Sequence, residues 1–277
     1  MATGRALVLG GGGLAGIAWH TGVLHGMADV GLDVTGADAI VGTSAGATVA
    51  AQISSGRPLE TWFRNQVEPS FQNEEKRPGI SVVELWETML RLLEEFPDPI
   101  ERRRRVCALA LEADTVPEPT RRAVVAGRLV GCEWSDRKVA IVAVDAADGD
   151  RAVFDAGSGV ELVDAVAASS AVPGIWPPVT IGDSRYVDGG VYSSCNADLA
   201  AGSERVLVLA PMADGEMPVQ VELLTRDGRV EVLSPDADSL AAFGSNPLDP
   251  AVRSPEGRAG YSQGQRSAAA IADWWTA

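Results

Sequence analysis

The chain has 277 residues, of which 46% are apolar and 22% are charged, and its 23 basic and 38 acidic side chains leave a formal net charge of −15 at pH 7. These fractions are typical of a globular protein with a substantial core, and they exclude intrinsic disorder over most of the chain. The acidic excess argues against nucleic acid as a partner and against standing attraction to anionic membranes, because both need clustered positive charge.

The apolar stretch over residues 6–30 predicts neither a secretion signal nor a membrane span. Glycines at residues 10–13 interrupt it, and His20, His25 and Asp29 follow. A spanning helix needs about 20 largely uninterrupted apolar residues, and a signal peptide needs a basic leading segment and a cleavage site. We therefore expect a soluble protein.

The three cysteines, Cys107, Cys132 and Cys195, are widely spaced and form no pair or cluster with histidine. This spacing predicts neither a structural zinc site nor a disulfide framework. Isolated thiols fit the reducing cytoplasm, which is where we expect the protein to act.

The first 56 residues predict alternating strands and helices. The expected elements, in chain order, are a buried strand at residues 5–9, a helix from about residue 16 to Gly31, a strand at 39–41 and a small-residue helix at 44–53. This order is typical of the start of a doubly wound α/β fold with a mostly parallel sheet.

The middle of the chain, residues 57–134, is rich in proline and charge and has no strand pattern. Helical periodicity is visible at about 81–96 and 100–113, so we expect a helical insertion that caps one end of the sheet. The later expected elements are strands at 138–144, 151–154, 205–209 and 230–233, a helix at 161–170, a hairpin at 179–187 and a polar C-terminal helix within 250–277. We expect a single domain over residues 1–277.

A G-x-S-x-G sequence, residues 42–46, separates the second strand from the helix that follows it. A nucleophilic serine has to project from a tight turn, and Gly42 and Gly46 leave room for that turn. The start of the next helix directs N–H groups toward developing negative charge. The pattern predicts that Ser44 is a nucleophile.

The glycine run after the first strand, residues 10–16, allows two interpretations. Gly11, Gly13 and Gly16 satisfy the dinucleotide fingerprint, with Asp33 or Asp38 at about the distance of a ribose-binding acid. The alternative is an oxyanion hole made of backbone N–H groups. Because the serine turn lies within the next βα unit, and parallel strands place both turns at one sheet edge, we favour the oxyanion hole.

The general base is identified by the scarcity of histidine. The chain has two histidines, His20 and His25, and both precede Ser44, so the usual order of serine, acid and histidine is impossible. The best alternative is Asp188, at the end of a short strand before Gly189 and Gly190, which permit a sharp turn.

Three motifs in this order resemble the patatin-like phospholipase family: the glycine run at 11–16, the serine turn at 42–46 and Asp-Gly-Gly at 188–190. The segment 167–174 is similar to a further family motif. The resemblance implies a three-layer α/β/α fold and hydrolysis of acyl esters, usually of lipids. It implies Ser44 as the nucleophile, Asp188 as the base and an oxyanion hole at Gly11, Gly12 and Gly13.

The resemblance departs from the family in one place, since Ala15 stands where many members carry Arg or Lys. This puts the preference for anionic phospholipid in doubt, but not the pair Ser44 and Asp188. The mechanism needs no metal or cofactor, and an ordinary aspartate pKa of about 3.9 would leave Asp188 ionised at neutral pH. The expected partner is a lipid or other acyl ester, with at most transient membrane contact.

Overall fold

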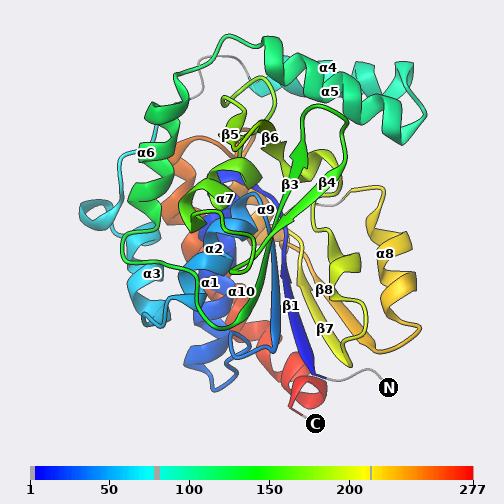
Figure 1. Ribbon diagram of the computed structural model, residues 1–277. Coiled ribbons are helices and arrows are strands. Elements are labelled where there is room, and N and C mark those ends of the chain that lie inside the picture. Colours follow the sequence, from blue (N-terminus) through cyan, green and yellow to red (C-terminus); the bar gives the residue numbers. More distant parts are fainter. Residues whose placement is uncertain (1–3, 78–81, 213, 277) are drawn as a thin grey trace.

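The computed structural model describes residues 4–77, 82–212 and 214–276. Within them an eight-stranded sheet has the order β5-β6-β3-β2-β1-β7-β8, with β4 paired to β3 (Figure 1). The strands are β1 Arg5–Leu9, β2 Ala39–Thr43, β3 Lys138–Asp145, β4 Arg151–Phe154, β5 Val179–Ile181, β6 Ser184–Asp188, β7 Arg205–Leu209 and β8 Arg229–Leu233.

The sheet is parallel from β3 to β8, and β4 and β6 run antiparallel to β3. The register along β3 fixes the relation between two distant parts of the chain. Thr43 at the end of β2 pairs with Val142, and the next β3 residue, Ala143, pairs with Asp188 at the end of β6. The residues that follow Thr43 therefore lie close to Asp188.

The helices cover both faces of the sheet. They are α1 Gly13–Asp29, α2 Ala45–Ser54, α3 Leu59–Val67, α4 Val82–Glu95, α5 Pro99–Glu112, α6 Glu118–Arg128, α7 Leu162–Ser169, α8 Met217–Leu224, α9 Ala237–Phe243 and α10 Arg253–Trp275, with short 3-10 turns η1 Pro69–Phe71, η2 Gly189–Val191, η3 Ala197–Ala200 and η4 Pro250–Val252. The larger core lies between the sheet and α1, α2, α7 and α10, and the smaller core lies under η3 and α8 (Figure 1). The predicted three-layer α/β/α fold is confirmed.

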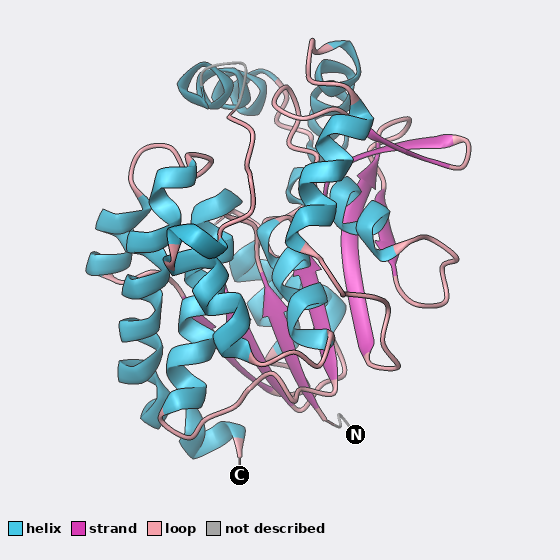
Figure 2. Ribbon diagram, turned by 90° about the vertical axis from the view of Figure 1, so that its left-hand side faces the viewer, coloured by secondary structure: helices cyan, strands magenta, loops and turns pink. Residues whose placement is uncertain are grey.

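The 57–134 stretch is helical, as expected, but it does not act as one unit. α3 packs against α1 and α10 and so joins the large helical layer, and α6 packs against α7. α4 and α5 lie beyond the ends of the strands (Figures 1 and 2). Periodicity predicted α4 and α5 but missed the shorter helices α3, α6, α8 and α9. Residue 81, the expected start of α4, lies outside the described residues.

The boundaries near the glycine run also differ from expectation. α1 begins at Gly13 and not near residue 16, because Gly13 adopts a positive φ of 63° and turns the chain directly into the helix. At the other end Gly31, with a φ of 95°, terminates the helix as predicted.

The C-terminal helix α10 packs along α1 although its sequence is polar. Glycines on both helices allow this contact, because an added Cβ at Gly26 would lie 2.1 Å from the Tyr261 carbonyl oxygen, and one at Gly264 would lie 2.2 Å from the Val23 carbonyl oxygen. In the part of the chain that the structure describes, no helix has the length and hydropathy needed to span a bilayer.

Replacing Gly26 with Ala should destabilise the protein by about 1–3 kcal/mol, because the methyl group would force α1 away from α10. Glycine to alanine in a helix normally stabilises by about 0.5–1 kcal/mol, so the sign is diagnostic. Chemical denaturation measures the change. Gly36→Ala is the control, since nothing lies within 4 Å of the added Cβ there; equal stability of the two variants would contradict the close approach.

Candidate active site

The turn between β2 and α2 holds Ser44 in a strained conformation. Its φ of 54° and ψ of −111° are unusual for a residue with a side chain, and only Asn196 shares a positive φ among the described non-glycine residues. An added Cβ at Gly46 would lie 1.9 Å from the Leu9 carbonyl oxygen, so no larger residue fits there. An added Cβ at Gly42 would lie 2.8 Å from Ala47 Cα. The motif glycines are thus required by close backbone approach.

Ser44 Oγ donates a hydrogen bond of 2.7 Å to Asp188 Oδ2. The other carboxylate oxygen, Oδ1, accepts the Gly190 N–H at 2.7 Å, which fixes the orientation of the carboxylate. An added Cβ at Gly189 would lie 2.3 Å from the Val142 carbonyl oxygen, so this turn also needs glycine. The structure therefore brings together the two residues that the sequence singled out, and both are buried.

Burial raises the pKa of Asp188 to about 6. The hydrogen bonds from Ser44 and Gly190, and the positive charge of Arg121, act in the opposite direction. The ordinary value used in the sequence analysis was therefore too low. A carboxylate with a higher pKa is a stronger base, and most of it is still ionised at pH 7.

The N–H groups of the glycine run are not equivalent. Gly10 N–H donates to the Leu209 carbonyl oxygen at 3.0 Å and Gly11 N–H to the Ser194 carbonyl oxygen at 2.8 Å. Among the described residues, the N–H groups of Gly12, Gly13 and Ala45 have no acceptor. The expectation that Gly11 belongs to the oxyanion hole is therefore corrected, because its donor is already used.

Neither histidine contacts Ser44. His20 is buried, donates from Nε2 to the Gly10 carbonyl oxygen at 2.9 Å, and has a pKa lowered by burial to about 4, so it is neutral at pH 7. His25 packs against the rings of Phe63 and Tyr261. His20 therefore holds the Gly10 carbonyl oxygen at the start of the glycine run, and neither histidine is bonded to Ser44 as a base would be.

The segment 167–174 connects the two halves of the site. The hydroxyl oxygen of Ser169, the last residue of α7, accepts the Ser44 N–H at 2.9 Å. Two residues later the Ala171 carbonyl oxygen accepts the Asp188 N–H at 3.0 Å. This segment therefore holds the backbone of both residues.

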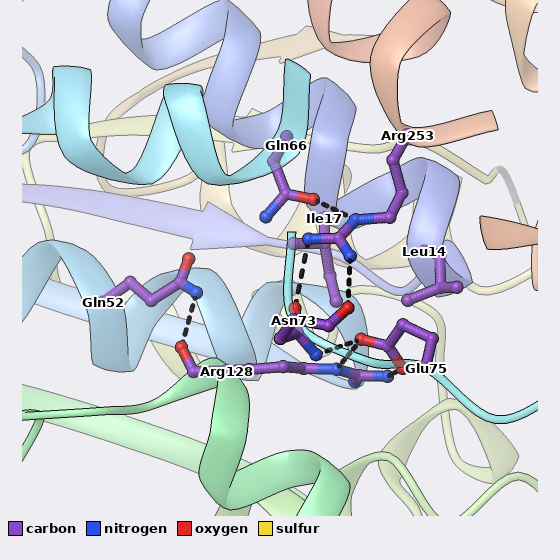
Figure 3. A pocket seen from close by; sticks show the side chains of 8 residues that line it. All are labelled: Leu14, Ile17, Gln52, Gln66, Asn73, Glu75, Arg128 and Arg253. Carbon is purple, nitrogen blue, oxygen red and sulfur yellow. Dashed lines mark hydrogen bonds and ion pairs between the residues drawn. The ribbon is translucent and has the colours of Figure 1, made fainter. Parts of the chain in front are cut away.

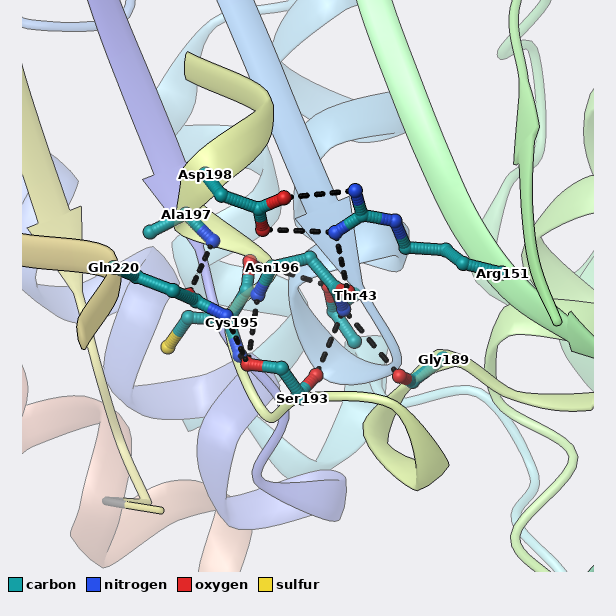
Figure 4. Close-up of polar contacts among 9 residues, drawn as sticks. All are labelled: Thr43, Arg151, Gly189, Ser193, Cys195, Asn196, Ala197, Asp198 and Gln220. Atoms are coloured by element: carbon teal, nitrogen blue, oxygen red, sulfur yellow. Dashed lines mark hydrogen bonds and ion pairs between the residues drawn. The ribbon is translucent and has the colours of Figure 1, made fainter. Parts of the chain in front are cut away.

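Asn196 is a positioning residue that the sequence analysis missed (Figure 4). It is buried with a φ of 51°, and its Nδ2 donates to Thr43 Oγ1 at 3.1 Å and to the Gly189 carbonyl oxygen at 3.3 Å. Arg151 donates to its Oδ1 at 3.3 Å and pairs with Asp198. Asn196 thus connects the residue before Ser44 to the residue after Asp188, and a single asparagine in a loop has no pattern that predicts this.

A second polar cluster lies around Leu14 and Ile17, in the first turns of α1 (Figure 3). Arg128 forms two hydrogen bonds with Glu75, at 2.8 and 2.6 Å, and Arg253 donates to Gln66 Oε1 at 2.9 Å and to Asn73 Oδ1 at 3.1 Å. The gap between these side chains does not admit a water molecule. The cluster is therefore packed, and we assign no ligand to it.

The acids required by the dinucleotide interpretation lie away from the glycine run. Asp38 accepts the Arg5 N–H at 2.7 Å, at the opposite end of β1, and Asp33 accepts from Thr35. No group of His, Cys, Asp and Glu side chains within the described ranges is arranged to hold a metal ion.

Comparisons with known proteins found a matching family model and similar solved structures. A family model described as "Patatin-like phospholipase" matches residues 7–201. Among solved structures, VipD from Legionella pneumophila has a TM-score of 0.46 at 12% identity, over 97% of this chain and 67% of its own. The type III effector ExoU has a TM-score of 0.40 at 18% identity, over 96% of this chain and 53% of its own, so this chain spans about half of ExoU. A search of curated proteins found no match.

The strain at Ser44 predicts that Ser44→Gly is more stable than Ser44→Ala by about 1 kcal/mol, because both lose the hydroxyl but only glycine relieves the positive φ. Thermal or chemical denaturation of the two variants measures the difference. At Ala47, inside α2, glycine should instead be less stable than alanine by about 0.5–1 kcal/mol. Equal stability of the two Ser44 variants would show that the turn is not strained.

Proposed function

Because the chain belongs to the patatin-like phospholipase family, we propose that it is a serine acyl hydrolase that cleaves carboxylic ester bonds of lipids. The observation that carries the proposal is the 2.7 Å hydrogen bond from Ser44 Oγ to Asp188 Oδ2, at the turn that follows a parallel strand. A hydroxyl in this position can lose its proton to the carboxylate as it attacks.

In the first half-reaction Ser44 Oγ attacks the ester carbonyl carbon and Asp188 accepts the hydroxyl proton. The carbonyl π electrons move to oxygen, and the N–H groups of Gly12, Gly13 and Ala45 stabilise the oxyanion. These donors are supported by their lack of other acceptors and by their place at the starts of α1 and α2. Each such donor typically contributes about 2.7–4 kcal/mol of transition-state stabilisation.

The first half-reaction ends when Asp188 gives up this proton, and the second is hydrolysis of the acyl-enzyme. The tetrahedral intermediate collapses, and Asp188 protonates the departing alkoxide, which leaves an ester between the acyl group and Ser44 Oγ. Water then attacks this ester while Asp188 takes its proton, and collapse releases the carboxylic acid and restores the Ser44 hydroxyl. The reaction needs no metal or redox cofactor.

An apolar cluster beside the site supports a lipid substrate. Leu85 of α4 packs against Ile175 and Trp176, and Leu248 joins them. Leu248 also reaches the glycine run, because its Cδ2 would lie 2.8 Å from an added Cβ at Gly13. We propose that this cluster receives the acyl chain and that α4, whose Leu90 is exposed, makes transient contact with a lipid surface.

Ser44→Ala and Asp188→Asn should each abolish hydrolysis of short p-nitrophenyl esters, because one removes the nucleophile and the other the base. Loss of a nucleophile or base typically lowers kcat by about 10⁴-fold or more. Asp183→Asn, at the exposed hairpin turn, is the matched control and should keep wild-type kcat/KM. Labelling of wild type, but not of Ser44→Ala, by a fluorophosphonate probe gives a second readout; full activity in either site variant would refute the assignment.

The kcat/KM should fall about tenfold per pH unit below pH 6, because Asp188 must be ionised and its pKa is about 6. Protonation of Asp188 should not itself unfold the protein, so the fall in kcat/KM should not result from unfolding driven by this residue. Its folded pKa exceeds the unfolded value of 3.8, so its contribution to stability is full below pH 3.8 and is lost as pH rises through 6. Circular dichroism at each pH is the control, and constant kcat/KM down to pH 4 would contradict the role of Asp188.

A further inference from the structure

Arg121, in α6, carries a buried guanidinium whose Nε and Nη1 have no hydrogen-bond acceptor. The side chain is 3% exposed, and its Nε and Nη1 are enclosed but form no hydrogen bond or ion pair with any described residue. The adjacent Arg122 shows the contrast, because it lies nearer the surface and pairs with Asp164 and Glu161. A buried cation without a hydrogen-bond acceptor is unfavourable, so its presence requires a reason.

The guanidinium lies beside the proposed catalytic pair. Its Cζ is 4.1 Å from the centroid of the Trp176 ring, and Trp176 follows in the loop that begins at Ala171, the residue that accepts the Asp188 N–H. The charge of Arg121 is close enough to lower the pKa of Asp188. Arg121 therefore acts within the electrostatic environment of the site.

The two carboxylates whose charges act on Arg121, those of Glu75 and Asp188, accept hydrogen bonds from other groups. The Glu75 carboxylate is bound by Arg128 through two hydrogen bonds, and the Asp188 carboxylate is bound by Ser44 and Gly190. Burial and the charge of Arg128 lower the pKa of Arg121 to about 9, which leaves it protonated at pH 7. The negative charges of Glu75 and Asp188 partly offset that of Arg121, but neither carboxylate supplies a hydrogen-bond acceptor to its Nε or Nη1.

An apolar surface connects this cation to the glycine run. Trp176, on which the guanidinium stacks, packs with Leu85 and Ile175, and Leu248 extends the same cluster to Gly13. The glycine run itself carries no charged side chain. A ligand that fits both features has an apolar chain and an anionic oxygen group.

We propose that Arg121 binds an anionic oxygen group of an amphiphilic substrate, either a phosphate or a carboxylate, while the apolar cluster takes its hydrocarbon chain. Binding supplies the hydrogen-bond acceptors that Nε and Nη1 lack. That the bound molecule is a substrate rests on the proposed function, but binding at this site does not depend on hydrolysis. Arg121 is then the residue that determines specificity for charged over neutral esters.

Calorimetric titration of the wild-type protein with hexyl phosphate, hexanoate, hexanol and inorganic phosphate tests the site without requiring catalysis. We expect the preferred anionic amphiphile to bind about 10- to 100-fold more weakly to Arg121→Met, as loss of a charge-assisted hydrogen-bond pair predicts. Arg122→Gln, which removes the same charge from the surface of the same helix, should bind as wild type does. A preference for hexyl phosphate or for hexanoate identifies the anionic group. Tight binding of inorganic phosphate alone would show that no hydrocarbon chain is needed and would refute the proposal of an amphiphilic ligand.

The melting temperature separates a binding role from a structural one. Arg121→Met should melt at or above the wild-type temperature, because it removes an unpaired buried charge and keeps the packing on Trp176. A lower melting temperature together with unchanged affinity would make Arg121 structural and overturn the proposal. Should Arg121→Met not fold, Arg121→Lys, which keeps the charge but not the planar fork, should show weaker binding; wild-type affinity in that variant would also overturn it.

The two proposals fail in different ways. Tight binding of the anionic amphiphile by a protein that hydrolyses no ester would leave this inference standing and refute the proposed function. Hydrolysis of a neutral ester, with no difference in kcat/KM from a matched anionic ester in either wild type or Arg121→Met, would refute only the role of Arg121.

Discussion

The pairing of β3 with β2 on one side and with β6 on the other is the constraint on which the site depends. Consecutive β3 residues, Val142 and Ala143, pair with Thr43 and Asp188, so the ends of two strands far apart in the sequence meet. Hydrogen-bonding strands lie about 4.8 Å apart, which brings the next side chains within reach of one another. The site is thus a consequence of register, and a slip of one residue would turn Asp188 to the other face.

This geometry has two physical costs, and both occur at the residues that meet. Ser44 adopts a positive φ, and Asp188 places a carboxylate where burial raises its pKa. The surrounding backbone compensates through fixed donors and acceptors, since the Ser44 N–H reaches Ser169 and the Asp188 carboxylate accepts the Gly190 N–H. Strain and burial of this kind persist only where the rest of the fold determines the conformation.

The sequence predicts those site residues at which close backbone approach allows only glycine. Gly42, Gly46 and Gly189 each lie where an added Cβ would meet a neighbouring backbone, and such positions appear as glycines at fixed spacing. The sequence does not predict contacts made by single side chains, which explains why Asn196 was missed. It also does not reveal where an N–H points, and for that reason Gly11 was assigned to the oxyanion hole although it donates to Ser194.

The packing of the polar helix α10 was likewise not predictable from the sequence. The sequence predicted only a polar C-terminal helix, but Gly260 and Gly264 let it pack on α1 through close backbone contact. Amphipathic periodicity measures apolar side chains, so it does not detect packing that depends on their absence. The fold class was predictable because the strands are continuous apolar runs, whereas the short helices α3, α8 and α9 carry too few periods to be recognised.

Burial also explains why a site without histidine can work near neutral pH. In water an aspartate with a pKa of about 3.9 is a weak base, and neither histidine forms a hydrogen bond with Ser44. Removing water raises the pKa of Asp188 to about 6, which approaches the value that histidine would supply. The hydrogen bonds from Ser44 and Gly190, and to a smaller extent the charge of Arg121, limit this rise in pKa, so most of the carboxylate is ionised at pH 7. The basicity of Asp188 is therefore set by a balance between burial, which raises its pKa, and the hydrogen bonds that its carboxylate accepts, which lower it.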